Sequence, residues 1–240
     1  MKAMIFAAGL GTRLKPLTDN MPKALVPLTG KSLLQWQVEK LMQAGISDII
    51  VNIHHKGDMI IDSIQSQHGW GANITISDER ERLLDTGGGV LKVKGEGLKD
   101  EKLLVCNVDI LSNIDLEQLV HSAGQENTLV VSERPTQRYL CFDEDGYLCG
   151  WTNIATGQLR GKDGQHLAYS GMAILQSSMD KYLKMVAAEK GDVFGLVDVY
   201  LKAAECGEKI KAYIPTNYRM MDVGKYDQLE QAEQFAQQLM

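Results

Sequence analysis

The start of the chain constrains the fold most, because an apolar run from Ala3 to Ala8 ends abruptly at the glycine-containing segment 9–13. An apolar run of this length that stops at glycine is typical of a buried strand leading into a tight loop. Glycine lets the backbone approach a ligand and turn its N–H groups outward, which suits a phosphate. Because the cations Arg13, Lys15 and Lys23 follow, we expect this segment to hold the triphosphate of a nucleotide.

Strand-like and helix-like segments alternate after this loop. Ser32 with Gln35 three residues later is typical of a helix start, and Met59, Ile60 and Ile64 are expected to face inward from a second helix. The alternation predicts an α/β fold with a mainly parallel sheet covered by helices on both faces. The expected strands cover residues 48–53, 72–77 and 103–106, and the second helix covers residues 57–67.

Composition excludes several classes of protein. The 240 residues are 44% hydrophobic, enough for a substantial core in one large or two small domains. The net charge of -6 disfavours a general nucleic-acid binder, and no apolar run approaches the length of a membrane span. The first strand runs straight into the glycine loop, so we expect no cleavable signal. The cysteines show no C-x-x-C pairing, which favours a reduced, cytoplasmic protein.

The phosphate loop does not match the common nucleotide motifs. There is no Walker A pattern, and Leu14 stands where the dinucleotide fingerprint needs its third glycine. The longer string Gly-Leu-Gly-Thr-Arg-Leu, followed by Pro-Leu-Thr and Pro-Lys-Ala-Leu, resembles the signature of the sugar nucleotidyltransferases, also called nucleoside-diphosphate-sugar pyrophosphorylases. The resemblance implies that Arg13 and Lys23 neutralise the phosphates and act in catalysis. The nucleotide-binding residues that it implies in this loop are Ala8, Gly9, Gly11, Thr12, Arg13 and Lys23.

A second glycine-rich segment, residues 85–89, opens an expected helix. Glycines at a helix start allow a flat ligand to approach the backbone, and a helix N-terminus favours polar or anionic groups. A flexible loop explains the segment equally well by itself. The resemblance implies that it is the second nucleotide loop, in which Thr86, Gly87 and Gly88 contact the base.

Two acidic residues are candidate ligands of Mg²⁺. Asp109 lies just past a predicted strand, where parallel sheets bind ligands, and carboxylate oxygens suit this ion. Asp222 is flanked by apolar residues, and a buried carboxylate needs a partner. That partner is either a metal shared with Asp109 or a salt bridge to Arg219 or Lys225. The resemblance implies the shared metal, with Asp222 also close to the substrate.

The residue before Asp109 departs from the family's usual pattern. The family commonly has glycine at this position, whereas this chain has Val108, which adds bulk near the expected metal. Asn107, one residue earlier, is expected beside the metal and in contact with the sugar.

Residues 138–173 consist of short apolar segments separated by turn-forming residues, which is typical of hairpins. The resemblance implies that this β-rich region holds the sugar phosphate, with Ser170 and Gly171 in contact with it. Many family members carry a Glu-Lys-Pro here, but this chain has Gly-Trp-Thr at 150–152, so that lysine has no counterpart. Arg138 and Arg160 are candidate replacements.

The resemblance implies a Rossmann-like, mixed and mainly parallel sheet flanked by helices, with a β-rich sugar-binding subregion. It also implies one nucleotidyltransferase domain over 1–240, divided into a nucleotide-binding half (1–135) and a sugar-phosphate-binding half (136–240). The expected partners are a nucleoside triphosphate and a sugar 1-phosphate, with neither nucleic acid nor membrane. Attack of the sugar phosphate on the α-phosphorus needs no strong base, so catalysis is expected to depend on positioning and electrostatic stabilisation.

The short length and the Thr-Gly-Gly-Gly at 86–89 are most similar to the N-acetylmuramic acid 1-phosphate uridylyltransferases, followed by the mannose or heptose 1-phosphate guanylyltransferases. The sequence leaves the base, the sugar and the oligomeric state open. A nucleotide-binding regulatory protein without turnover is one alternative. A phosphocholine cytidylyltransferase is another, and it would need an aromatic cage, for which Trp70, Trp151 and Tyr169 are candidates.

Overall fold

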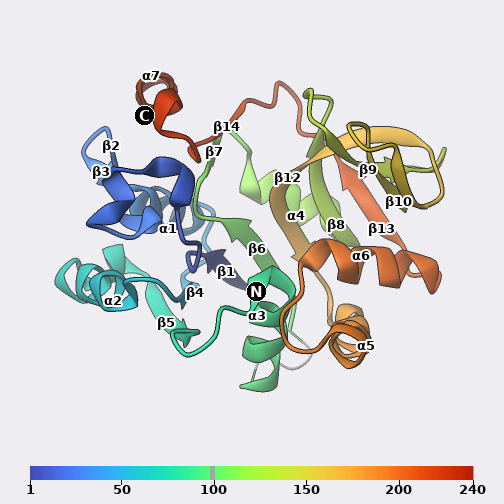
Figure 1. The fold of residues 1–240 in the computed structure, drawn as a ribbon, viewed down its shortest axis with the longest axis horizontal. Coiled ribbons are helices and arrows are strands. Elements are labelled where there is room, and N and C mark those ends of the chain that lie inside the picture. Colours follow the sequence, from blue (N-terminus) through green and yellow to red (C-terminus); the bar gives the residue numbers. More distant parts are fainter. Residues whose placement is uncertain (98–100, 240) are drawn as a thin grey trace. The chain divides into compact units, whose positions relative to one another are not determined.

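The computed structural model describes residues 1–97 and 101–239, which form two compact units (Figure 1). Each unit is assembled from separate stretches of the chain. Unit 1 comprises Met1–Leu83, Val105–Leu116 and Arg219–Met240, and unit 2 comprises Leu84–Leu104 and Glu117–Tyr218. The two units are defined by contacts within the chain and not by ligand binding. The division into a nucleotide-binding half and a sugar-phosphate-binding half at residue 135 therefore stays a prediction.

The main sheet of unit 1 is parallel. Its elements are β1 (Lys2–Phe6), α1 (Leu33–Gln43), β4 (Asp48–Ile53), α2 (Gly57–Ser66), β5 (Asn73–Asp78) and β6 (Leu103–Asn107). The strand order is β6-β1-β4-β5, and β4 runs parallel to both β1 and β5. Helix α1 packs against β1 and α2 against β5, so helices join the consecutive strands. This arrangement confirms the predicted α/β class and the mainly parallel sheet.

The local signals of the two helices are largely confirmed. The Ser32 hydroxyl accepts a hydrogen bond from the Gln35 N–H at 3.1 Å, as expected of a helix cap. Ile60 and Ile64 are buried, but Met59 is 39% exposed, so its expected inward position is wrong. Successive helical residues point about 100° apart, which turns Met59 away from the stripe that its two neighbours form.

Two small ladders complete unit 1. They are built from β2 (Pro27–Leu28), β3 (Lys31–Ser32), β7 (Ile110–Ser112) and β14 (Met220–Asp222), and α7 (Leu229–Gln237) follows. β2 and β3 form a hairpin. β7 and β14 pair antiparallel, although they are far apart in the sequence, with Asp222 opposite Ile110. This pairing carries the C-terminal segment to the end of β6.

Unit 2 contains the predicted β-rich region. Its strands are β8 (Asn127–Ser132), β9 (Arg138–Phe142), β10 (Leu148–Asn153), β11 (Gln158–Gly161), β12 (Gln165–Leu175) and β13 (Ile210–Tyr213). Strands β9, β10 and β11 form successive antiparallel hairpins, and β12 pairs antiparallel with β8 and β9. The hairpins confirm the change of pattern that the sequence predicts after residue 138.

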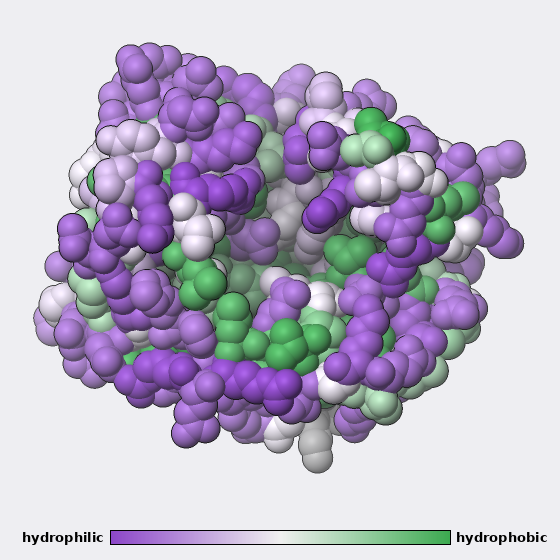
Figure 2. Space-filling model, in the orientation of Figure 1, coloured by the Kyte–Doolittle hydropathy of each residue, from purple (hydrophilic) through white to green (hydrophobic). Residues whose placement is uncertain are grey.

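The helices of unit 2 are α3 (Asp85–Gly95), α4 (Leu116–Ala123), α5 (Asp180–Lys190) and α6 (Leu196–Glu205). Helices α3, α5 and α6 contact one another, and α6 also packs on β10. The visible surface is mainly hydrophilic, with apolar residues in smaller patches (Figure 2). Among the described residues, no helix combines the length and apolar character needed to span a membrane.

Candidate active site

The site in unit 1 lies where β1 and β6 end. The two strands are neighbours in the sheet, and the Val108 N–H donates a hydrogen bond to the Phe6 carbonyl oxygen at 3.2 Å. The loop after β1 and the segment that carries Asp109 therefore start at the same edge of the sheet. Ligands of open α/β sheets bind outside the carboxyl ends of the strands, so this edge is the expected place for a nucleotide.

The loop after β1 turns on Gly11. This residue has a left-handed backbone with φ of 65°, and a Cβ there would lie 2.9 Å from Thr18 Cγ2 and 3.0 Å from Lys23 Cβ. The buried Thr18 hydroxyl donates to the Gly11 carbonyl oxygen at 2.8 Å. Only glycine fits this conformation and this space, and its N–H stays available. Within the described chain, the N–H groups of residues 9–11 have no acceptor.

The first residues of the loop are held by an element that sequence reasoning missed. Asn52 Oδ1 accepts hydrogen bonds from the N–H groups of Ala7 and Ala8, at 2.7 and 3.3 Å. The Asn52 amide donates in turn to Glu79 Oε1 at 2.8 Å, and both side chains are buried. The N–H of Ala8 is therefore already used by the protein. A polar residue in the otherwise apolar strand 49–53 was the signal that could have revealed this support.

Four predicted site residues from distant parts of the sequence meet beside this loop. Lys23 Nζ forms an ion pair with the Asp109 carboxylate, and the two side chains are only 11% and 15% exposed. The Val223 N–H donates to the Asp109 carbonyl oxygen at 2.8 Å, which fixes Asp222 next to Asp109. Arg13 Nη2 lies 3.9 Å from Asp222 Oδ2. Arg13, Lys23, Asp109 and Asp222 thus form one cluster, in which two adjacent carboxylates are flanked by two cations.

The surroundings of Asp222 differ from the sequence expectation. Its side chain is 48% exposed rather than buried, and the cation beside it is Arg13. Arg219 instead donates a hydrogen bond to Gln238 at 2.8 Å. Partial burial, followed by the nearby Asp109 carboxylate, raises the pKa of Asp222, while Lys23 and Arg13 act in the opposite direction. A carboxyl whose pKa is raised by a second carboxylate beside it is typical of a site that gains from added positive charge.

The close approach of Arg13 to Asp222 explains why residue 224, the last of the Asp-Val-Gly segment, is glycine. A Cβ at this position would lie 2.5 Å from Asp222 Oδ1 and 2.8 Å from Arg13 Nη2. A side chain at residue 224 would therefore separate Arg13 from Asp222.

Val108 is compatible with this arrangement. Its side chain is 4% exposed and its backbone does not adopt a positive φ, so no glycine is required. The added bulk is buried.

The donor set suits a divalent cation. Asp109 and Asp222 offer carboxylate oxygens from adjacent segments, and Mg²⁺ prefers oxygen ligands. Their like charges, together with the raised pKa of Asp222, are the electrostatic signature that such an ion would relieve. The residues present therefore fit the ion that the sequence suggested.

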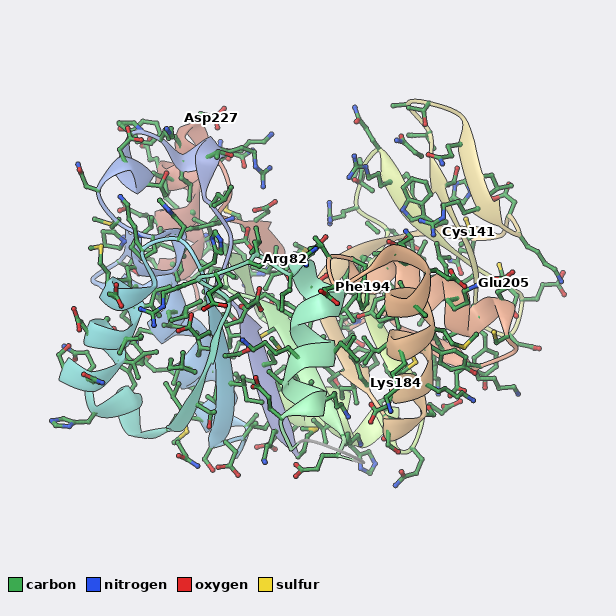
Figure 3. The ribbon with its side chains drawn as sticks, turned by 60° about the horizontal axis from the view of Figure 1, so that its bottom comes forward. Arg82, Cys141, Lys184, Phe194, Glu205 and Asp227 are labelled. Atoms are coloured by element: carbon green, nitrogen blue, oxygen red, sulfur yellow. The ribbon has the colours of Figure 1, made fainter. Side chains whose placement is uncertain are left out.

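The second glycine segment belongs to unit 2, where it forms the first turn of α3. The N–H groups of Gly87 and Gly88 donate to the Phe194 carbonyl oxygen at 2.9 and 3.1 Å. A Cβ at Gly87 would lie 2.5 Å from the Phe194 ring, and one at Gly88 would overlap the carbonyl oxygen of Asp192. Phe194 lies close to the start of α3 (Figure 3). These glycines thus allow the chain at 192–194 to pack closely, which accounts for them without a ligand.

Thr86 has a structural partner as well. Its hydroxyl oxygen accepts a hydrogen bond from the N–H of Leu196, the first residue of α6, at 3.0 Å. Nucleotide contact by Thr86, Gly87 and Gly88 stays a prediction.

The predicted sugar-binding residues occupy strand ends and strand irregularities. Asn107 is the last residue of β6 and is half-buried. Ser170 is 1% exposed, and its hydroxyl oxygen has no hydrogen-bond partner in the described part of the chain. Gly171 has φ of 71° at a register shift between β12 and β8. An unpartnered buried hydroxyl beside an irregular backbone is compatible with a ligand contact.

The candidate replacements for the missing lysine differ in availability. Arg160 forms an ion pair with Asp198 at 2.8 Å and lies over the Trp151 ring. Arg138 is exposed at the start of β9.

Tyr169, one candidate for an aromatic cage, packs edge-on against Tyr200 with ring centroids 5.9 Å apart. Trp151 and Tyr169 thus have partners within the protein.

Known proteins resemble the chain in both sequence and fold. The family model described as nucleotidyl transferase matches residues 2–238. The N-acetylmuramate alpha-1-phosphate uridylyltransferase of Caulobacter vibrioides is 40% identical over 112 residues, 45% of each protein. The mannose-1-phosphate guanyltransferase beta-B of Xenopus laevis is 30% identical over 210 residues, 82% of this chain and 58% of that protein. The chain thus spans about half the length of the curated relatives it matches.

Solved structures share the fold. HddC from Yersinia pseudotuberculosis, complexed with GMP-PN, aligns with a TM-score of 0.73 at 23% identity, over 98% of this chain and 99% of that one. A UDP-glucose pyrophosphorylase complexed with UDP-glucose aligns with a TM-score of 0.80 at 18% identity, over 100% of both chains.

Proposed function

Because the chain belongs to the nucleotidyl transferase family, we propose that it joins a nucleoside triphosphate to a sugar 1-phosphate, giving a nucleotide sugar and pyrophosphate. The observation that carries the proposal is the cluster of Arg13, Lys23, Asp109 and Asp222 at the ends of β1 and β6. The available N–H groups of residues 9–11 lie in the adjoining loop. Cations and N–H donors bind phosphates, and paired carboxylates bind a metal.

The reaction needs charge stabilisation more than proton transfer. The attacking oxygen of a sugar 1-phosphate is already an anion, so repulsion from the triphosphate and charge on the leaving pyrophosphate are the main barriers. Arg13, which is 57% exposed, can turn toward the leaving pyrophosphate. Lys23, held by Asp109, neutralises charge on the phosphates, and Gly11 and Thr12 supply backbone donors. Lys23 and the backbone donors are fixed, so they stabilise developing charge without reorganising.

Asp109 and Asp222 would hold Mg²⁺ in this proposal. When bound, the ion supplies positive charge to phosphate oxygens and relieves the repulsion between the two carboxylates. The chain's own contribution is to fix the carboxylates through the β7–β14 ladder and the hydrogen bond between residues 223 and 109.

We propose uridylyl transfer to N-acetylmuramate 1-phosphate as the first substrate pair to test, and guanylyl transfer to mannose 1-phosphate as the second. The names of the relatives at 40% and 30% identity support this order. Asn107, Ser170 and Gly171 are the proposed sugar contacts.

We further propose a cytoplasmic location, which the four free cysteines support.

The deciding experiment measures pyrophosphate release with Mg²⁺. The four ribonucleotides and thymidine triphosphate are each combined with a panel of sugar 1-phosphates and with phosphocholine. A productive sugar 1-phosphate pair would establish the proposal and name its substrates. Turnover restricted to cytidine triphosphate and phosphocholine would replace it with the cytidylyltransferase alternative. No turnover by a folded preparation that binds nucleotide would refute it in favour of a binding protein.

A further inference from the structure

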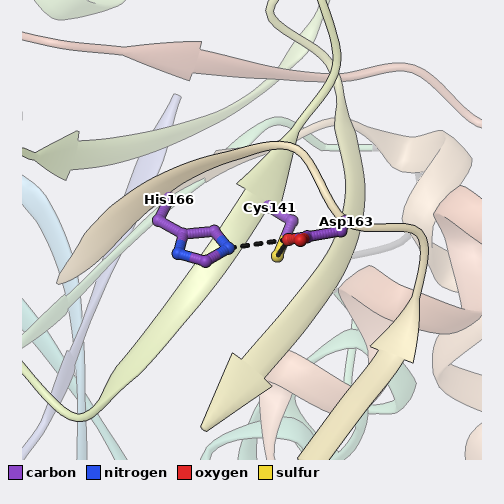
Figure 4. Close-up of side chains that lie close together, drawn as sticks. All are labelled: Cys141, Asp163 and His166. Atoms are coloured by element: carbon purple, nitrogen blue, oxygen red, sulfur yellow. Dashed lines mark hydrogen bonds and ion pairs between the residues drawn. The ribbon is translucent and has the colours of Figure 1, made fainter. Parts of the chain in front are cut away.

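Unit 2 contains a cluster of three side chains of the kinds that bind transition metals (Figure 4). Cys141 Sγ lies 3.8 Å from Asp163 Oδ1, and His166 Nε2 lies 2.7 Å from the same oxygen. The three potential ligand atoms all lie within 4.8 Å of one another. This is the sole cluster of its kind within 1–97 and 101–239, and nucleotidyl transfer as proposed above uses none of its members.

The fold brings these residues together by regular pairing. Cys141 in β9 and His166 in β12 are direct partners in the antiparallel ladder, so their side chains leave the same face of the sheet. Asp163 lies in the turn between β11 and β12, three residues before His166. Its carboxylate accepts the Gly164 N–H at 3.0 Å. The cluster therefore follows from strand register and turn geometry rather than from mobile side chains alone.

Two further contacts hold the cluster in shape. A Cβ at Gly164 would overlap the carbonyl oxygen of Phe142, so glycine allows the turn to pack tightly against β9. The Tyr139 ring stacks on the His166 ring, with centroids 5.6 Å apart and planes 20° apart. The stacking orients the imidazole, whose Nε2 faces Asp163.

We propose that Cys141, Asp163 and His166 form a binding site for a zinc-class divalent cation, with a fourth position open to water. Tetrahedral zinc takes sulfur, nitrogen and oxygen ligands at about 2.0–2.3 Å, which places the ligand atoms about 3.4–3.6 Å apart. The separations in the cluster reach these values with side-chain shifts of about 1 Å. Asp163 and His166 are 66% and 38% exposed, so both have room to move.

The chemistry of the donors selects the class of metal. A thiol and an imidazole are poor ligands for Mg²⁺ or Ca²⁺, which prefer oxygen, but they suit zinc and its neighbours. Burial, followed by the Asp163 charge, raises the pKa of the Cys141 thiol to about 12. The thiol is thus neutral in the free protein, and a bound dication would release its proton. The resulting thiolate and the Asp163 carboxylate would balance the two positive charges.

The bound ion would act as a cross-link. It would join Cys141 in β9 to Asp163 in the turn before β12, 22 positions later in the sequence. The free energy of binding would add to the stability of unit 2.

The test uses the full chain with a non-thiol reductant that keeps Cys141 and Cys149 reduced. Cobalt is titrated as a probe, because a thiolate ligand gives cobalt a charge-transfer absorption band. Zinc binding is then measured by equilibrium dialysis and by displacement of the cobalt. We expect one equivalent of cobalt with the thiolate band, displacement by zinc, and a higher melting temperature with zinc than with a chelator.

Matched variants assign the ligands. Cys141→Ser, Asp163→Asn and His166→Gln should each weaken zinc binding at least about tenfold, since even the loss of an outer-shell partner has an effect of that size. Cys206→Ser, which removes an exposed thiol outside the cluster, should bind like the wild type. Because Asp163 is exposed, Asp163→Asn tests the site even if Cys141→Ser does not fold.

Three results would overturn the proposal. They are a wild-type protein without the thiolate band, a cluster variant that binds zinc like the wild type, and a Cys206→Ser protein that loses the binding. None of these readouts involves nucleotide transfer. The test of the metal site is therefore independent of the test of the proposed catalytic function.

Discussion

Replacing Gly224 with alanine probes the proposed active site through geometry alone. The new Cβ would lie 2.5 Å from Asp222 Oδ1 and 2.8 Å from Arg13 Nη2, whereas real Cβ contacts are essentially never under 3.0 Å. Asp222 and Arg13 would have to move by about 1 Å to restore normal contacts. Misplacement of that size can lower the rate of a positioned reaction by about 100-fold, or about 2.7 kcal/mol in the activation barrier.

The expected result is a fall in kcat/KM of about 10- to 100-fold with little change in melting temperature. Stability is preserved because the displaced side chains are about half exposed and can move into solvent. The assay is pyrophosphate release with the productive substrate pair, together with thermal unfolding.

Gly95→Ala is the matched control, because a Cβ there meets nothing within 4 Å and the residue lies at the end of α3. It should retain the wild-type rate. If Gly224→Ala also retains a rate within about twofold of the wild type, the position of Arg13 against Asp222 does not contribute to catalysis and the assignment is wrong.

Other perturbations test separate parts of the argument. Asp109→Asn and Asp222→Asn should each greatly reduce Mg²⁺-dependent turnover while circular dichroism stays unchanged, and near-normal rates in both would remove the metal assignment. The raised pKa of Asp222 means that the folded state disfavours its ionised form, so the ionised group lowers stability as the pH rises through that pKa. Asp222→Asn should therefore melt at a higher temperature than the wild type at pH 7, and an unchanged or lower melting temperature would contradict the direction of the shift. Gly88→Ala should destabilise the protein by thermal unfolding, because its Cβ would overlap the carbonyl oxygen of Asp192; a normal melting temperature with weakened nucleotide binding would instead favour a ligand role. Burial lowers the pKa of Lys40 to about 8, so the unfolded state binds more protons between about pH 8 and the ordinary pKa of 10.5. The free energy of unfolding should thus rise over that interval in the wild type relative to Lys40→Met, and parallel pH profiles would refute the shift.

Local and periodic signals predicted much of the fold. The apolar run before the glycine loop became β1, Ser32 caps α1, and the turn-rich stretch after residue 138 forms hairpins. Each of these features depends on neighbours within a few residues, which the sequence displays directly. The position of Asp109 also follows from its place after an apolar strand, because parallel strands end at a common edge.

Features that depend on distant pairing were not predictable. The cation beside Asp222 is Arg13, although Arg219 and Lys225 are its neighbours in sequence. The antiparallel pairing of β14 with β7 sets this partner, and nothing in either short strand specifies the other. Likewise, the glycines at 87 and 88 resemble a ligand loop in sequence, but they pack against Phe194, more than 100 residues later.

The candidate site gains its rigidity from residues that touch no expected substrate. Asn52 holds the start of the glycine loop, and Thr18 closes it through the Gly11 carbonyl. Behind the carboxylates, Gln37 donates to the Ile110 carbonyl oxygen at 2.6 Å, and Lys40 donates to the Ser112 carbonyl oxygen at 2.6 Å. Helix α1 therefore supports β7, which in turn positions β14.

These supporting hydrogen bonds would fix the site before the proposed reaction begins. Electrostatic stabilisation of a phosphate reaction is effective when donors and charges are fixed before the reaction, so that no reorganisation opposes the developing charge. Asn52→Ala removes no proposed ligand contact, but it frees the loop backbone and leaves Glu79 without its amide partner. We expect it to lower kcat more than a surface substitution would, with a loss of stability of about 1–3 kcal/mol for the buried hydrogen bonds. Unchanged kcat in a protein destabilised to that extent would show that the loop does not need this support.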